Sequence, residues 1–108
     1  MDCIFCKIIA GAIPSAKVAE TEDLLVIKDI APKAPVHYLI IPKKHSVDIR
    51  EWSGSELPLA GKIVACAQQL SKQQNNCDFR LVISNGFDAG QRVFHTHVHY
   101  LAGGKFTD

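Results

Sequence analysis

The sequence predicts an α+β domain, in which an antiparallel sheet of about five strands is combined with one long helix and a short N-terminal helix. Short runs rich in β-branched residues recur along the chain, proline and glycine separate them, and a single segment has helical periodicity. The chain has 108 residues, a length typical of one domain, and contains no internal repeat or linker. Residues 1–108 are therefore treated as a single domain.

The first half of the chain predicts one short helix and several strands. Residues 3–10 are mostly apolar and predict a helix that ends at Gly11, a typical C-cap residue. The strands are expected at residues 17–20, 24–29 and 36–41. The last of these segments is almost continuously apolar, which favours a central strand buried on both faces. Residues 46–52 are ambiguous and could form a turn of helix.

The second half contains the segment with helical periodicity. Residues 55–73 predict one long amphipathic helix, with Ser55 as its N-cap. Two further strands are expected at residues 79–84 and 93–101, joined by a loop at 85–90 that is rich in turn-forming residues.

Composition and charge argue against several classes of protein. The formal net charge is +1 and the densest basic cluster is Lys43-Lys44, so nucleic-acid binding is not indicated. No apolar run approaches the roughly 20 residues that cross a bilayer. The acidic Asp2 lies where a signal peptide would carry basic residues. We therefore expect a cytoplasmic protein, in which the 4 cysteines are thiols or metal ligands rather than disulfides.

The most informative segment is His95-Thr96-His97-Val98-His99. Residues two apart in a strand point to the same face, so the three histidines should share one face of the last predicted strand. Phe94 and the residues between the histidines should face the core. Such a group of imidazoles indicates a functional site rather than scattered structural histidines.

Three neighbouring histidines could either bind a catalytic metal or act in nucleophilic catalysis. A single catalytic metal is disfavoured, because about 3.3 Å per residue places His95 and His99 roughly 13 Å apart along a regular strand. A neutral imidazole can instead attack phosphorus and form a covalent phosphoramidate, while neighbouring histidines orient it and handle protons. Backbone N–H groups of the turn at residues 90–92 are suited to bind the anionic oxygens.

The cysteines and the remaining histidines have separate interpretations. Cys3-Ile4-Phe5-Cys6 has the spacing of half a zinc site, although two unreactive thiols would give the same pattern. Cys66 on the long helix is interpreted as a small core residue and Cys77 as a loop thiol. His37 alternates with core positions and is interpreted as a hydrogen-bonded structural histidine.

The segment His95-Thr96-His97-Val98-His99-Tyr100-Leu101 resembles the His-x-His-x-His-x-x signature, with x apolar, of the histidine-triad superfamily. Over essentially the whole chain, the sequence is similar to the Hint branch of purine-nucleoside phosphoramidate hydrolases. Further matching segments are residues 4–9, 13–14, 29–37, 41–45, 85–86, 90–91 and 103–104. The resemblance implies a histidine-triad fold and a hydrolase or transferase that cleaves conjugates of nucleoside 5′-monophosphates.

The resemblance also implies residue roles. His97 would be the nucleophile that forms a covalent nucleotidyl intermediate, His99 would contact the α-phosphate, and His95 would support the histidine network. Asp29 would accept hydrogen bonds from both ribose hydroxyls. The purine would lie between Ile4, Phe5, Ile8, Ile27 and Ile30. The phosphate oxygens would be held by Asn85, Gln91 and the Arg92 backbone, within the turn that begins at Gly90.

A structural zinc ion and a homodimer follow from the same resemblance. Some microbial members close the Cys3 and Cys6 site with two histidines, which match His45 and His95 here. The two-fold interface would involve the long helix and a neighbouring strand, and Leu59 and Ile63 broaden the apolar face of that helix.

Two departures from the family pattern concern the leaving group. Arg92 stands where relatives often have serine, and the C-terminal tail, which shapes leaving-group specificity in the family, is short. Two other functions remain open at this stage: a nucleotide-binding adaptor with negligible turnover, and a zinc-dependent hydrolase. The leaving group and the choice between adenine and guanine are not determined by the sequence.

Overall fold

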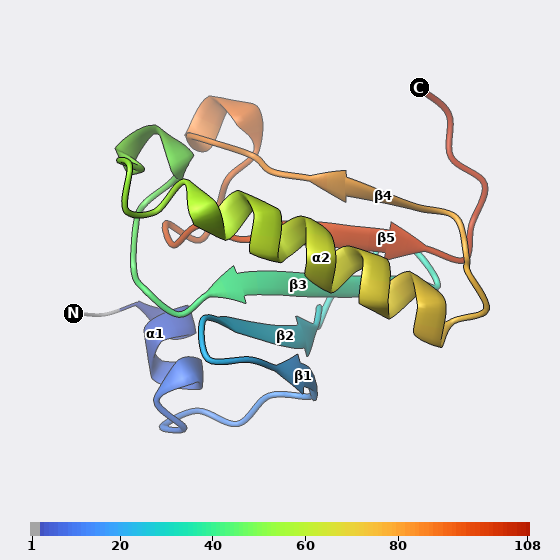
Figure 1. Ribbon diagram of the computed structural model, residues 1–108, viewed down its shortest axis with the longest axis horizontal. Coiled ribbons are helices and arrows are strands. Elements are labelled where there is room, and N and C mark those ends of the chain that lie inside the picture. The colour runs from blue at the N-terminus through green and yellow to red at the C-terminus, as the bar shows by residue number, and fades with distance from the viewer. Residues whose placement is uncertain (1–2) are drawn as a thin grey trace.

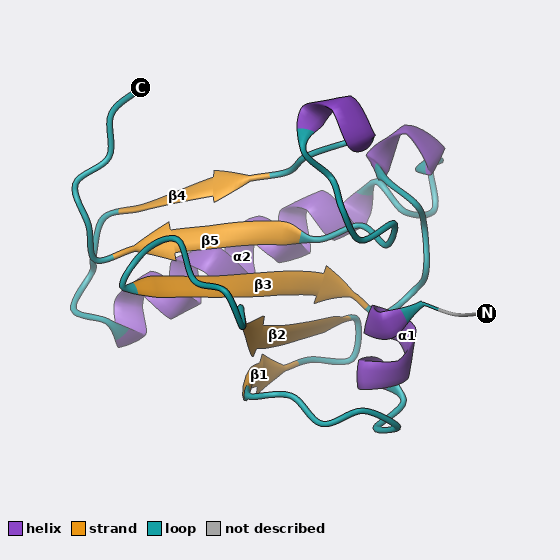
Figure 2. Ribbon diagram, turned by 180° about the vertical axis from the view of Figure 1, so that it is seen from behind, coloured by secondary structure: helices purple, strands orange, loops and turns teal. Residues whose placement is uncertain are grey.

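A five-stranded antiparallel sheet with the strand order β1-β2-β3-β5-β4 forms the centre of the computed structural model, which describes residues 3–108 (Figures 1 and 2). The strands are β1 Lys17–Glu20, β2 Leu24–Lys28, β3 Val36–Pro42, β4 Phe79–Val82 and β5 Val98–Ala102. The helices are α1 Ile4–Ile9 and α2 Pro58–Gln73, with short 3-10 turns at Ile49–Glu51 and Phe87–Ala89. The predicted fold class is confirmed, and the ambiguous segment at 46–52 contains the first of these turns.

The sheet separates two apolar cores. Helix α2 lies across one face of the sheet (Figure 1), and its Ile63, Ala67 and Leu70 are buried against β2, β3 and β5. Helix α1 packs on the opposite face, where Phe5 joins alternate residues of β2 and β3. Strand β3 contributes Ile40 to the first core and Leu39 to the second. This arrangement confirms the expectation that β3 is buried on both faces, and it explains its continuous apolar sequence.

Helix α2 begins later than the sequence indicated. Its first residue is Pro58, and Ser55 lies in the preceding turn, where its hydroxyl donates to the Glu56 carboxylate. Proline is favoured at the first helical position because the N–H that it lacks would have no partner within the helix. The prediction of Ser55 as the N-cap was therefore wrong.

Strand β5 is also shorter at its start than predicted. It begins at Val98, so His95 and His97 lie in the segment that precedes it, where residues 93–95 form a bend. β4 ends at Val82, which pairs with His99, and residues 93–97 therefore have no neighbour on that side. The carbonyl of Pro42, the last residue of β3, accepts from Nε2 of the His95 ring.

Phe94 and Thr96, which were both expected to face the core, differ in their burial. Phe94 is 47% exposed and does not face the core, which corrects the assignment based on strand alternation. Thr96 is buried, and its N–H donates to the Ser46 carbonyl at 2.8 Å. Within residues 3–108, no helix is long and apolar enough to cross a membrane.

Candidate active site and metal-ligand cluster

A cavity of about 290 Å³ lies between helix α1, the face of β2 and β3 that α1 covers, and the loop that leads into β5. Its apolar lining consists of Ile4, Phe5, Ile8, Ile27, Leu39 and Val93. Asp29, His97 and His99 also line it. A larger hollow of about 420 Å³ beside α2 is lined mainly by apolar surface and contains no histidine. The smaller cavity is therefore the candidate site, because it combines an apolar wall with polar groups.

A hydrogen bond holds one ring nitrogen of His97, and the other nitrogen is available to react. Its Nδ1 lies 2.7 Å from the His95 carbonyl oxygen, which can only accept, so Nδ1 carries the proton. Nε2 of the neutral ring therefore keeps its lone pair. Burial lowers the pKa of His97 below its ordinary value, and the Phe5 ring packs edge-on against it at 5.1 Å between centroids. The ring is thus neutral at pH 7 and suited to nucleophilic attack.

His99 is oriented by a second chain of hydrogen bonds. The Lys33 backbone N–H donates to Nδ1 of His37 at 3.0 Å, so the proton of the neutral His37 ring is on Nε2. This Nε2 lies 2.9 Å from Nδ1 of His99 and 3.3 Å from Oδ2 of Asp29. Nδ1 of His99 accepts, and the proton of its neutral ring is on Nε2. The expectation that His37 is a buried, hydrogen-bonded histidine is confirmed.

The lowered pKa of His99 predicts that the stability of the folded protein depends on pH. Burial and the neighbouring His97 and His37 lower the pKa of His99 to about 4. In the unfolded chain a histidine has a pKa of about 6.5, so between these values the unfolded state binds more protons. We expect stability to fall as the pH decreases from about 6.5 towards about 4. Urea unfolding across this range, with His99→Asn for comparison, measures the effect, and an identical decrease in the variant would contradict it.

Asp29 and Ile30 occupy the edge of the cavity. The Ala31 N–H donates to Oδ1 of Asp29 at 2.8 Å, which fixes the carboxylate while its side chain remains 18% exposed. Ile30 lines the cavity but is fully exposed at 100%. These two positions are compatible with contacts to a ligand that enters from solvent.

Asn85 and Gln91 are placed away from the cavity, where they stabilise the loop before β5. The buried Gln91 amide donates to the carbonyls of Val47 and Val93, and its oxygen accepts from the Gly86 N–H. The Asn85 side-chain oxygen accepts from the Ile49 N–H at 3.0 Å. In this structure neither side chain lines the cavity, whereas Gly90 and Arg92 from the same loop do. Gly90 has φ of +105°, a conformation that favours glycine.

Four cavity residues were not anticipated from the sequence: Lys28, Lys33, Leu39 and Val93. Leu39 pairs directly with Ile27 across β2 and β3, so it could have been found from strand register once the pairing was known. The sequence does not identify Lys28 and Lys33 as cavity residues, because charged residues flank strands in most proteins.

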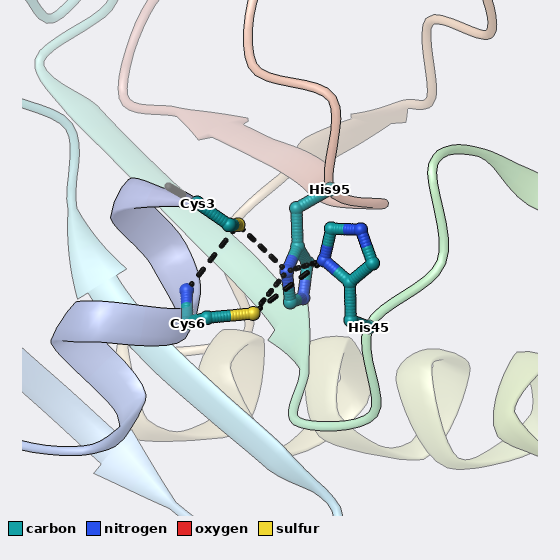
Figure 3. A group of neighbouring side chains, drawn as sticks. All are labelled: Cys3, Cys6, His45 and His95. Carbon is teal, nitrogen blue, oxygen red and sulfur yellow. Dashed lines mark hydrogen bonds between the residues drawn. The ribbon is translucent and has the colours of Figure 1, made fainter. Parts of the chain in front are cut away.

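A separate cluster is formed by Cys3, Cys6, His45 and His95, whose ligand atoms all lie within 4.8 Å of one another (Figure 3). Nδ1 of His95 lies 3.3 Å from the Cys3 sulfur, 3.5 Å from the Cys6 sulfur and 3.1 Å from Nδ1 of His45. Tetrahedral zinc with ordinary Zn–N and Zn–S bonds places N–N and N–S pairs about 3.3–3.6 Å apart.

The orientation of His95 suits metal binding. Its Nε2 lies 2.7 Å from the Pro42 carbonyl oxygen and must donate, so the lone pair of the neutral ring is on Nδ1, which faces both thiols. Cys3 is the N-cap of α1, and its sulfur accepts from the Cys6 N–H at 3.4 Å. The donor set therefore fits a four-coordinate zinc ion, and it separates His95 from the two histidines that line the cavity.

Comparison with known proteins identifies the family. The model of the family described as "Scavenger mRNA decapping enzyme C-term binding" matches residues 2–106. An "Uncharacterized HIT-like protein" of Chlamydia trachomatis is 45% identical, and the match covers 96% of this chain and 95% of that protein. The chain belongs to the histidine-triad superfamily.

Solved structures of histidine-triad proteins have the same fold. A HIT family hydrolase from Legionella pneumophila superposes with a TM-score of 0.93 at 38% identity, covering 98% of this chain and 96% of its own. A histidine triad protein from Clostridium difficile gives 0.94 at 40% identity, with coverages of 100% and 96%. The name of the first of these relatives supports a hydrolase as the kind of protein.

Proposed function

We propose that this histidine-triad protein hydrolyses phosphoramidate-type conjugates of purine nucleoside 5′-monophosphates through a covalent nucleotidyl intermediate on His97. The observation that carries the proposal is the orientation of His97, whose Nδ1 is bound to a backbone carbonyl while its ring lines the cavity. This geometry leaves Nε2 as the attacking atom. The relatives named as HIT family hydrolases support the reaction class.

The reaction proceeds in two displacements. Nε2 of His97 forms a bond to the α-phosphorus, the P–N bond to the leaving amine breaks, and the departing nitrogen takes a proton from water, which leaves hydroxide. Water then attacks the same phosphorus and gives its proton to that hydroxide, the bond to His97 breaks, and the nucleoside 5′-monophosphate is released. The Nε2–H of His99 donates to a phosphate oxygen, and backbone N–H groups at residues 90–92 supply further donors.

The rest of the cavity suits a nucleoside. The apolar walls from α1, β2 and β3 suit a flat purine ring, with Ile4, Phe5, Ile8, Ile27 and Ile30 in contact with it. The Asp29 carboxylate at the cavity edge has the acceptor capacity to bind both ribose hydroxyls. In this assignment Asn85 and Gln91 contribute to phosphate binding by holding the loop that carries Gly90 and Arg92.

A direct test is to trap the intermediate. The protein is mixed with an adenosine 5′-phosphoramidate, quenched at alkaline pH within a turnover, digested and analysed by mass spectrometry. We expect one adenylyl group on the peptide that contains His97. Tight nucleotide binding without any adduct or turnover would instead identify a nucleotide-binding adaptor.

We further propose that the cluster of Cys3, Cys6, His45 and His95 binds a structural zinc ion. All four ligands come from the protein, so the coordination sphere has no open position for a catalytic water. The other set of potential ligands, Asp29, His37 and His99, is less suitable because the Lys33 N–H occupies Nδ1 of His37, so the Nε2 that faces this set carries the proton and has no lone pair for a metal. These contacts favour a histidine nucleophile over a zinc-dependent hydrolase.

We also propose a homodimer that involves α2 and the free edge of β4. β4 is the last strand of the sheet, and its Phe79 and Val82 are 37% and 38% exposed. On α2, Val64 is 51% exposed. Ile63, which was expected to broaden the apolar face of α2 at the interface, is only 4% exposed and packs in the core beneath the helix, so this part of the expectation is corrected. A second copy could extend the sheet through the β4 edge.

Val64→Glu should therefore shift the protein from dimer towards monomer, because the two-fold axis would bring two new charges into one interface. Sedimentation velocity over a dilution series measures the shift, and we expect the dissociation constant to rise at least about tenfold. Ala65→Glu is the matched control, because Ala65 is exposed on the side of α2 that faces β1. A wild-type protein that is monomeric at micromolar concentration would contradict the proposal.

A further inference from the structure

The cavity that contains His97 is bordered by three cationic side chains, Lys28, Lys33 and Arg92. The carboxylate of Asp29 is the acidic group among the lining residues, and it is already bonded to the Ala31 N–H. Within residues 3–108, none of the three cations forms an ion pair with a protein carboxylate. The cavity therefore has a surplus of positive charge that a bound ligand can neutralise.

Arg92 differs from the two lysines because its position is fixed. Its guanidinium lies over the Phe87 ring, 3.9 Å from the centroid. Nη1 donates to the carbonyls of Phe87 at 2.8 Å and of its neighbour Gln91 at 3.1 Å. These contacts occupy both protons of Nη1. The N–H groups on Nε and Nη2 have no hydrogen-bond partner within the described chain, and they remain for a ligand.

The chemistry of the guanidinium limits what Arg92 can contribute. It stays protonated at all ordinary pH values, so it cannot act as an acid for a departing amine. It can bind a carboxylate or a phosphate through two parallel N–H groups. We propose that Arg92 is a specificity-determining residue that selects leaving groups bearing a carboxylate or a phosphate close to the scissile bond. This inference rests on the proposed function of His97.

The first displacement can be written with all atoms and protons accounted for with either kind of leaving group. For an amino acid joined to phosphorus through its amine, the P–N bond breaks and the nitrogen takes a proton from water, while the carboxylate stays paired with Arg92. For a phosphate leaving group, the P–O bond breaks, and the phosphate departs with the bridging oxygen and takes a proton from water to become hydrogen phosphate. In both cases the His97–phosphorus bond forms as the other bond breaks.

A matched pair of substrates tests the selection. One is the adenosine 5′-phosphoramidate of an amino acid with a free carboxylate, and the other is its carboxamide, which has the same P–N bond but lacks the charge. We expect wild-type kcat/KM to be about tenfold higher for the carboxylate, as for a charge-assisted hydrogen bond. In Arg92→Gln this ratio should fall towards one.

Lys72→Gln is the control for the loss of one positive charge. Lys72 is an exposed cation in the last turn of α2 and does not line the cavity. This variant should retain the wild-type ratio. Adenosine 5′-diphosphate, which releases phosphate, is assayed against the carboxamide in the same way and separates a phosphate from a carboxylate as the preferred anion.

Two results would overturn the inference. If Arg92→Gln lowers kcat/KM equally for the charged and the uncharged substrates, Arg92 binds the α-phosphate. If the ratio of kcat/KM between each anionic substrate and the carboxamide is unchanged, Arg92 has no role in selection. Failure of the proposed function is distinguishable, because the wild-type protein would then form no adduct on His97 with any substrate.

Discussion

Replacing His97 with alanine or asparagine should reduce turnover of an adenosine phosphoramidate by about 10³-fold or more. The two-step reaction needs a nucleophile that accepts the nucleotidyl group, and neither variant has one. His99 cannot take over this role directly, because its Nδ1 accepts a hydrogen bond from His37 and its remaining nitrogen carries the proton. The measurement is steady-state kcat with each variant at saturating substrate.

Nucleotide binding should change much less than turnover in the same variants. The proposed contacts to the base and ribose come from α1, β2, β3 and Asp29, and the His97 ring makes none of them itself, although it packs against Phe5. Calorimetric titration with adenosine 5′-monophosphate should give a Kd within a few-fold of the wild-type value. A His97→Asn variant that retains more than about 1% of wild-type kcat would contradict the nucleophile assignment, and thermal unfolding of the same samples checks that the fold is intact.

Removal of zinc should produce the second large effect. We expect the purified, untagged protein to contain about one zinc ion per chain and to lose it in the double variant Cys3→Ser/Cys6→Ser. A tightly bound ion stabilises the folded state by about 4 kcal/mol at a thousandfold excess over its Kd. The midpoint of thermal unfolding should therefore fall by more than about 10 °C in the variant or after chelation.

Cys77→Ser provides the control for this experiment. The Cys77 sulfur donates to the Gln74 side chain at 3.4 Å, a contact that a serine hydroxyl can replace, and it lies outside the cluster. This variant should keep its zinc. Absence of zinc from the wild-type protein, or an unchanged zinc content in the double variant, would refute the assignment. Chelation that abolishes turnover before any loss of stability would instead favour a catalytic metal.

Much of the fold could be predicted because each element carries a local signal. Apolar periodicity predicts the long helix and runs rich in β-branched residues predict the strands, and the errors lie at the ends of these elements. The start of α2 was misplaced because serine is common at N-caps, whereas Pro58 fixes the first turn here. The start of β5 was misplaced because alternation continues through His95 and His97, although no neighbouring strand pairs with them.

The candidate site was predictable only in part, because its groups are oriented by contacts that are distant in the chain. Strand alternation predicts that the three histidines share one face of the last strand, but only His99 lies in β5, and the direction of each ring depends on particular partners. The Pro42 carbonyl directs Nδ1 of His95 towards the cysteines, and His37 directs the ring of His99. The position of Gln91 inside the loop likewise depends on Val47, which is 44 residues away.

The way Gln91 anchors its loop has a consequence for the evolution of the site. Its amide connects Gly86, Val47 and Val93, so both ends of the short segment between 86 and 91 are tied to the rest of the domain. Residues can be exchanged, added or deleted within that segment while the chain re-enters the sheet at the same place. Arg92 and Phe87 lie on this segment or next to it, whereas His97 lies beyond the anchor. In the proposed mechanism, leaving-group selection can therefore change while His97 remains in position, and the same segment is the natural place to graft a new specificity.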